Sequence, residues 1–100
     1  MKAASLRFHP AAVDEAEAAL SWYAERSTQA ASRFLADLER VLGEISEAPE
    51  RWPQFDGPAR RMLLRHFPYA VIYRVAGDRV EVLAVAHGRR RPGYWKKRGR

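Results

Sequence analysis

The residues best suited to chemistry gather in the last fourteen positions of the chain. From His87 to Arg100 the sequence reads HGRRRPGYWKKRGR, directly after a strongly strand-like segment. An imidazole can move protons near neutral pH. Guanidinium groups make paired contacts with phosphate or carboxylate, and aromatic rings can stack on unpaired bases. This segment therefore indicates either a nucleic-acid site or a surface for an acidic partner protein.

Cleavage of RNA without a metal is one reaction that such groups could carry out. The 2′-hydroxyl must lose a proton, the leaving 5′-oxygen must gain one, and the phosphate must be stabilised. If the protein is a nuclease, the expected catalytic residues are His87, Arg90 and Tyr94. For target binding in general, the expected residues are Arg61, Arg65, Arg89, Arg91 and Trp95.

Several of these candidates also have a purely structural interpretation. His87 ends a predicted strand, where a histidine is often a hydrogen-bonding residue and not a catalyst. Tyr94 and Trp95 could simply cover the edge of the sheet. Arg61 and Arg65 alternate with an apolar residue, and a solvated charged face would produce the same pattern.

The charge of the chain is distributed unevenly. Residues 1–59 contain six basic and ten acidic residues, whereas residues 60–100 contain twelve basic and two acidic residues. A C-terminal half this basic should attract polyanions or acidic proteins, and the attraction should weaken strongly with salt. The run Arg89–Arg91 is too dense for a solvated face alone, which favours a binding role for it.

The composition excludes several classes of function. Hydrophobic residues make up 47% of the 100 residues, so we expect one globular domain over residues 1–100. The chain has no cysteine, its three histidines lack metal-ligand spacing, and it has no nucleotide-binding glycine motif. No cofactor is therefore expected. No apolar run suits a membrane span or an export signal, which predicts a cytoplasmic protein with no membrane partner.

The N-terminal half of the sequence predicts a strand and two helices. Residues 3–8 alternate between apolar and polar side chains, as in a short strand. His9-Pro10 suits the start of a helix that runs to about residue 26. Ser27-Thr28 breaks the pattern and can cap a second helix, which Pro49 ends after about residue 47. Because almost nothing separates the helices, they should form an antiparallel hairpin.

The C-terminal half predicts three strands. Residues 49–59 hold three prolines and a glycine and should be a loop, after which the period changes to two. Strands are predicted over residues 60–66, 69–76 and 79–87, with Gly77-Asp78 as a tight turn. In the last strand, alternation puts Glu81, Leu83, Val85 and His87 on one face. The order β-α-α-β-β-β describes an α+β domain, a helical hairpin packed on a small antiparallel-rich sheet whose other face stays partly open.

Several segments in this order resemble the RelE/ParE family of bacterial toxins. They are the opening strand with HPAA at residues 9–12, the helical hairpin that ends at Pro49, FPYAVIYR at residues 67–74 and VLAVAHGRRRP at residues 82–92. The resemblance covers nearly the whole chain. It implies the RelE/ParE-like fold and the toxin component of a type II toxin–antitoxin pair. It also implies a cognate antitoxin as partner.

The resemblance implies two different targets. RelE-like toxins are metal-free endonucleases that cut messenger RNA on the ribosome, whereas ParE-like toxins inhibit DNA gyrase and are not nucleases. In this chain, residues 49–59 contain no lysine, Ala70 lies near the position of the mid-strand arginine of the nucleases, and Arg91 stands where relatives with the HGRR motif often carry an acid. These departures favour the ParE-like interpretation, with the RelE-like one as the alternative.

The same charges predict how partners would bind. An antitoxin segment rich in acidic residues and leucine could lie as an amphipathic helix against the helical hairpin and the basic sheet. The other partner would be DNA gyrase, or the ribosome and its messenger RNA. A third interpretation, from another class, is a nucleic-acid-binding module without catalytic activity, which should bind oligonucleotides directly.

Overall fold

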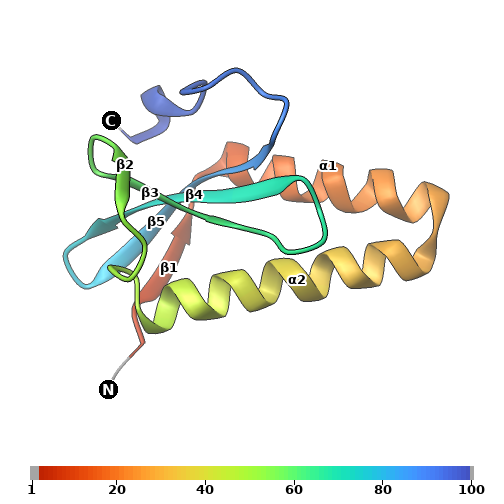
Figure 1. The fold of residues 1–100 in the computed structure, drawn as a ribbon, viewed down its shortest axis with the longest axis horizontal. Helices are drawn as coiled ribbons and strands as arrows, with labels where there is room; N and C mark the ends of the chain where they lie inside the picture. The colour runs from red at the N-terminus through yellow and green to blue at the C-terminus, as the bar shows by residue number, and fades with distance from the viewer. Residues whose placement is uncertain (1–2, 100) are drawn as a thin grey trace.

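Two helices pack against one face of a five-stranded sheet, and the C-terminal segment lies against the other face (Figure 1). The computed structural model describes residues 3–99. The elements are β1 (Ser5–Phe8), α1 (Pro10–Arg26), α2 (Thr28–Glu47), β2 (Gln54–Asp56), β3 (Ala59–Leu63), β4 (Tyr69–Ala76), β5 (Arg79–His87) and a short 3-10 helix, η1 (Lys96–Gly99). The predicted α+β class is confirmed.

A single residue, Ser27, separates the two helices of the hairpin. His9 caps α1, because its Nδ1 atom accepts a hydrogen bond of 3.1 Å from the backbone N–H of Ala11. Ser27 has extended backbone angles, ends α1 and caps α2, and its hydroxyl accepts from the N–H of Ala30 at 3.1 Å. The predicted hairpin is therefore confirmed, including the cap at Ser27.

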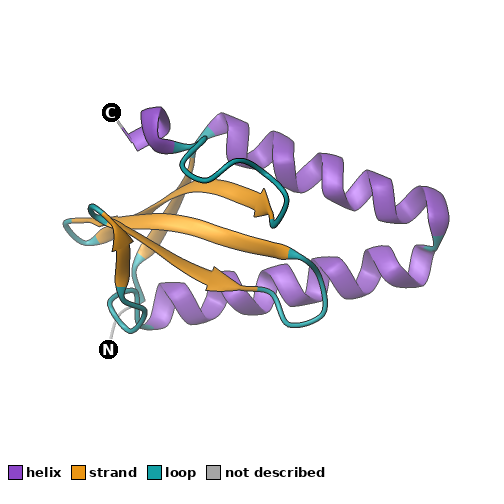
Figure 2. Cartoon of the chain, turned by 45° about the horizontal axis from the view of Figure 1, so that its top comes forward, coloured by secondary structure: helices purple, strands orange, loops and turns teal. Residues whose placement is uncertain are grey.

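The sheet has the strand order β1-β5-β4-β3-β2. The first strand runs parallel to the last, with Ser5 opposite Arg79 and Phe8 opposite Val82, and all other neighbouring strands are antiparallel. A parallel pair needs a crossover connection. Here the connection contains the helical hairpin, which is thereby held on one face of the sheet (Figure 2).

The boundaries of the strands differ from the prediction in three main places, the first being that β1 begins at Ser5 and not at residue 3. A short strand, β2, lies inside the predicted loop and pairs with β3 through an irregular register. The third strand ends at Leu63 and not at His66. The reason is Asp37 on α2, whose carboxylate accepts from the backbone N–H groups of Arg65 (2.9 Å) and His66 (3.2 Å) and turns the chain away from the sheet.

Asp37 can hold this turn because hydrogen bonds and the positive charge of Arg40 stabilise its ionised carboxylate. Burial alone would raise the pKa of this carboxyl, but hydrogen bonds from Arg40 and from the backbone of His66 and Arg65 outweigh burial and lower the pKa. The guanidinium of Arg40 lies 2.8 Å from the Asp37 carboxylate. Asp37 therefore stays ionised and holds the β3–β4 turn on α2.

The main core lies between the hairpin and the sheet. Val71 and Tyr73 of β4 are fully buried there together with Phe34 of α2. Alternation along β4 places these two residues on the side of the helices. The Phe34 ring also contacts the rings of Tyr69 and Phe67, with centroids 5.3 and 5.4 Å away. This aromatic cluster joins α2 to the end of the sheet where His87 lies.

The C-terminal segment covers part of the second face of the sheet, and the rest stays open, as predicted: Arg61 and Leu63 of β3 lie beside Ile72 and Ala70 on that face and are exposed. Trp95, only 6% exposed, packs there on Ile72 and Ala84. A register shift in β5 also places Leu83 in this second cluster, whereas Val85 faces the helices. The predicted common face of Leu83 and Val85 is therefore wrong, because one extra residue in a strand moves the following side chains to the other face.

Candidate functional site

The candidate site lies where β5 ends and the chain turns into the C-terminal segment. His87, the last residue of β5, pairs with Tyr69 of β4, and their rings meet edge to face with centroids 5.0 Å apart. Tyr69 in turn contacts Phe34 in the core. The position of the imidazole is therefore set by the sheet and by the aromatic cluster beneath it.

The hydrogen bond of His87 restricts what the imidazole can do. Its Nδ1 atom accepts from the backbone N–H of Arg89 at 3.0 Å. A neutral imidazole that accepts at Nδ1 carries its proton on Nε2. In this arrangement Nε2 can donate a hydrogen bond, but it cannot take a proton from a 2′-hydroxyl. The geometry suits a residue that shapes the turn better than it suits a general base.

The three arginines occupy a loop, residues 88–93, that we call the arginine loop. Its first half is fixed by backbone hydrogen bonds from Gly88 to Pro68 (2.7 Å) and from Arg90 to His87 (3.0 Å). Gly93, with φ of 77°, turns the chain back toward the sheet, a conformation that favours glycine. Along this loop the side chains of Arg89, Arg90 and Arg91 are exposed.

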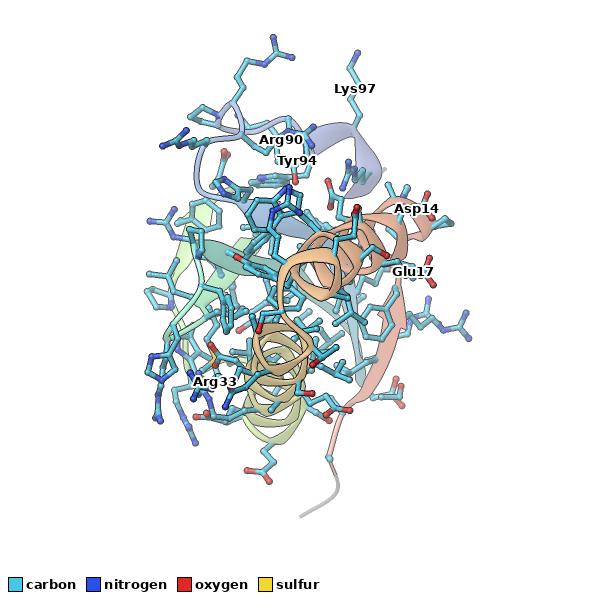
Figure 3. The ribbon with its side chains drawn as sticks, turned by 90° about the vertical axis from the view of Figure 1, so that its right-hand side faces the viewer. Asp14, Glu17, Arg33, Arg90, Tyr94 and Lys97 are labelled. Atoms are coloured by element: carbon cyan, nitrogen blue, oxygen red, sulfur yellow. The ribbon has the colours of Figure 1, made fainter. Side chains whose placement is uncertain are left out.

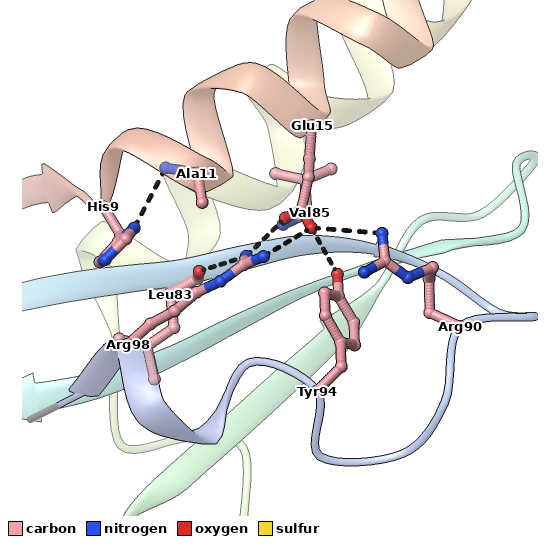
Figure 4. Close-up of polar contacts among 8 residues, drawn as sticks. All are labelled: His9, Ala11, Glu15, Leu83, Val85, Arg90, Tyr94 and Arg98. Carbon is pink, nitrogen blue, oxygen red and sulfur yellow. Dashed lines mark hydrogen bonds and ion pairs between the residues drawn. The ribbon is translucent and has the colours of Figure 1, made fainter.

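The far end of the arginine loop is fixed by Glu15 of α1 (Figure 4). This carboxylate accepts from the Tyr94 hydroxyl at 2.8 Å and from two guanidinium nitrogens of Arg98 at 2.9 and 3.1 Å. It also accepts from the backbone N–H of Val85 at 3.1 Å, and a nitrogen of Arg90 lies 3.8 Å away. The sequence offered no direct motif for this cluster, since its members are up to 83 positions apart.

Tyr94 takes part in this cluster as a neutral hydrogen-bond donor. Burial, and then the hydrogen bond to the Glu15 carboxylate, raise the pKa of Tyr94 to about 12. The Arg90 guanidinium lies over its ring, 3.9 Å from the centroid. A hydroxyl with this pKa that already donates to a carboxylate is poorly placed to exchange protons with a substrate near neutral pH.

The raised pKa predicts that Tyr94 stabilises the fold less at alkaline pH. The folded pKa lies above the unfolded value of 10.0, so the contribution is complete below pH 10 and is lost as the pH rises toward 12. We expect the difference in unfolding free energy between the natural protein and Tyr94→Phe to shrink over this range. Denaturant titrations at a series of pH values measure it, and a difference independent of pH would contradict the assignment.

The other predicted binding residues fall into different places. Trp95 is buried against the sheet, so the structure gives it the covering role and leaves no free ring face for a base. Arg61 is exposed, and its guanidinium lies 4.6 Å from the centroid of Phe55. Arg65 lies apart from these residues, in a basic hollow formed with α2 that also contains Arg33. Figure 3 shows Arg33 well away from Arg90 and Tyr94.

Two grooves border the arginine loop. A groove of about 600 Å³ lies between the loop and the sheet and is lined by Arg61, His87, Arg90 and Arg91 among others. A groove of about 770 Å³ separates the loop from α1, with Ala18 and the half-exposed Trp22 on its helix side. The first groove brings together most of the predicted site residues. The second combines an apolar wall with a basic rim.

A metal-binding cluster and a membrane-spanning helix are both absent from the described residues. Within residues 3–99, no three His, Asp, Glu or Cys side chains cluster in a way that could hold a metal ion. In the same part of the chain, no helix is long and apolar enough to cross a membrane.

Comparison with known proteins places this geometry in a family. The family profile described as "ParE toxin of type II toxin-antitoxin system, parDE" matches residues 6–92. Toxin ParE2 from two strains of Mycobacterium tuberculosis is 31% identical over 88 residues, which cover 87% of this chain and 84% of the relative. The structure entitled "Chromosomal ParDE TA system from P. aeruginosa" superposes with a TM-score of 0.73 at 17% identity, covering 84% of this chain and 95% of that chain.

Proposed function

Because this chain belongs to the ParE toxin family of type II toxin–antitoxin systems, we propose that it arrests growth by inhibiting DNA gyrase. We further propose that the arginine loop contacts the target, together with Arg61 on the neighbouring strand. A loop that presents three exposed guanidinium groups can make paired hydrogen bonds to phosphate or to carboxylate. Both kinds of group occur on an enzyme bound to DNA.

The observation that carries this proposal is that the candidate acid–base residues already form hydrogen bonds within the fold. His87 accepts a backbone hydrogen bond at Nδ1, and the Tyr94 hydroxyl donates a hydrogen bond to Glu15. Two of the three expected catalytic residues are thus engaged within the fold, while Arg89 and Arg91 remain exposed. This distribution favours a binding surface over a nuclease centre.

The proposed neutralising partner is a cognate antitoxin. The family is defined by toxin–antitoxin pairs, which supports such a partner. The groove between α1 and the arginine loop suits a segment with both apolar and acidic side chains. Its wall includes Ala18 and Trp22, and its rim includes Arg89 and Arg90. Apolar burial would supply affinity, and the arginines would favour an acidic sequence.

Messenger RNA cleavage on the ribosome is the second candidate. One observation favours it: His87, Arg61 and Arg90 line a single groove next to the sheet. In that reading the arginines would hold the phosphate and His87 would act from Nε2 as a proton donor to the leaving oxygen.

The replacement His87→Ala distinguishes gyrase inhibition from messenger RNA cleavage. General acid–base catalysis contributes about 10²–10⁴-fold, so a nuclease should lose most of its activity. A gyrase inhibitor that uses the arginine loop should keep its activity to within a few-fold. We expect the purified, antitoxin-free protein and His87→Ala to inhibit DNA supercoiling at similar concentrations.

The same preparations should be added to a translating extract, with messenger RNA ends mapped by primer extension. New cuts within codons that disappear in His87→Ala would overturn the gyrase proposal and establish the nuclease. Intact message together with inhibited supercoiling would support the gyrase proposal.

A further inference from the structure

The neighbouring strands β1 and β5 differ in length, and this leaves part of one edge of β5 without a strand beside it. The last residue of β1, Phe8, pairs with Val82, and the N–H of His9 donates to the Val82 carbonyl at 2.9 Å. The chain then turns into α1, whereas β5 continues to His87. The polar backbone groups on this edge beyond Val82 therefore need partners from elsewhere.

Two side chains supply partners for two of these groups. The Glu15 carboxylate accepts from the N–H of Val85 at 3.1 Å, and the Arg98 guanidinium donates to the carbonyl of Leu83 at 3.1 Å. Glu15 and Arg98 also bind each other through two hydrogen bonds, and their side chains are only 15% and 17% exposed. Together they continue the hydrogen bonding of the sheet where β1 has ended.

This pair also determines where the arginine loop lies. The loop is fixed at its start by His87 and the end of β5, and its other end leads to Tyr94, which donates to Glu15. Arg90, inside the loop, is stacked on Tyr94 and lies 3.8 Å from the same carboxylate. One carboxylate on α1 thus contacts the loop itself and two residues of the segment that follows it.

We infer that Glu15 is a positioning residue for target binding: it holds the arginine loop in the shape that the target recognises. This inference rests on the proposed role of the arginine loop in binding. A loop that is already in its bound shape loses less conformational freedom when it binds, so fixing it should increase affinity. Glu15 would act without touching the target.

Charge alone predicts the opposite effect, which makes the inference testable. Glu15→Gln removes one negative charge and makes the protein more basic than its formal net charge of +6. If attraction between a basic protein and an acidic target were all that mattered, this variant should bind as well as the natural protein or better. If Glu15 positions the loop, the variant should bind less well.

Glu17 offers a matched control on the same helix. It is exposed, points away from Tyr94 in Figure 3, and has no hydrogen bond or ion pair within residues 3–99. Glu17→Gln produces the same change in charge without affecting the cluster. Arg98→Gln breaks the main contact from the side of the C-terminal segment, so it tests the same link without altering α1.

The experiment compares these three variants with the natural protein by two measurements. Amide hydrogen exchange reports the order of residues 94–98, and growth arrest after induction without antitoxin reports toxicity whatever the target. We expect Glu15→Gln and Arg98→Gln to speed exchange in residues 94–98. We also expect both to need about tenfold more protein for arrest, whereas Glu17→Gln should match the natural protein.

Two outcomes would overturn the inference. Exchange in residues 94–98 that is unchanged in Glu15→Gln would show that Glu15 does not hold the segment. Faster exchange with unchanged growth arrest would show that the order of the segment does not matter for the target. If the natural protein arrests growth but leaves gyrase unaffected, the proposed target fails, while the comparison of variants still decides the role of Glu15.

Discussion

Simultaneous replacement of Arg89, Arg90 and Arg91 by glutamine is expected to abolish growth arrest and the proposed inhibition of DNA gyrase. All three side chains are exposed on the arginine loop, so the fold should survive the change. A hydrogen bond to a charged group contributes about 1.5–3 kcal/mol, and loss of even two such contacts would weaken binding by about 100-fold or more. Supercoiling assays over a range of toxin concentrations measure this loss.

A second triple variant controls for the change in net charge. Arg7, Arg33 and Arg79 are also exposed, but they lie on β1, α2 and the start of β5, away from the arginine loop. Their replacement by glutamine lowers the net charge by the same amount. We expect this control to retain nearly all activity. If both variants lose activity equally, long-range attraction drives target binding and the arginine loop has no special part in it.

Phe34→Ala is expected to have the largest effect on stability. Phe34 is fully buried, and its ring contacts those of Tyr23, Phe67 and Tyr69 at centroid distances of 5.3, 5.4 and 5.3 Å. Truncation of a buried phenylalanine costs about 3–5 kcal/mol, a large part of the roughly 5–15 kcal/mol that stabilise a domain. Equilibrium unfolding in urea should show a large decrease in the midpoint concentration.

The neighbouring residue provides the control for this second variant. Leu35 is 41% exposed, so Leu35→Ala removes little buried apolar surface. The replacement should lower the free energy of unfolding by less than about 1 kcal/mol. A similar loss in both variants would mean that the aromatic cluster is not the centre of the core. Because Tyr69 contacts both Phe34 and His87, the Phe34 variant should also loosen the start of the arginine loop.

The helices could be predicted from the sequence because their signals are local. Pro10 follows a capping residue, and Ser27 interrupts two stretches of helical periodicity, so both ends of the hairpin are encoded within a few positions. The strand β2 was missed, because three prolines and a glycine in residues 49–59 indicate a loop and a three-residue strand has too few positions to show a period.

The parts that could not be predicted depend on contacts between distant residues. The register shift near Leu83 occurs where Arg98 donates to its carbonyl, and nothing in the sequence around Leu83 signals it. Trp95 was expected to bind the target but lies in the core, since an aromatic residue in a basic tail gives no indication of which surface it meets. The position of the tail on the sheet had to come from the three-dimensional structure.

The candidate site was predicted in part. The arginines at residues 89–91 do lie together at the end of β5, and His87 does lie beside them. Glu15 was missed, although a signal for it exists. It lies on α1 three residues after Ala12 and four before Ala19, both buried, so a carboxylate occurs within the apolar stripe of the helix. A charge at such a position needs a partner, and here the partners come from the last residues of the chain.

The link between Glu15 and Arg98 has a consequence for how the toxin is made. The two residues are 83 positions apart, and a ribosome adds roughly 5–20 residues per second. The helical hairpin, built from neighbouring residues, is complete in sequence long before Arg98 has been synthesised. A nascent chain therefore cannot form the finished arginine loop until Arg98 has been synthesised. An antitoxin that recognises α1 could reach the growing chain before the toxin becomes active.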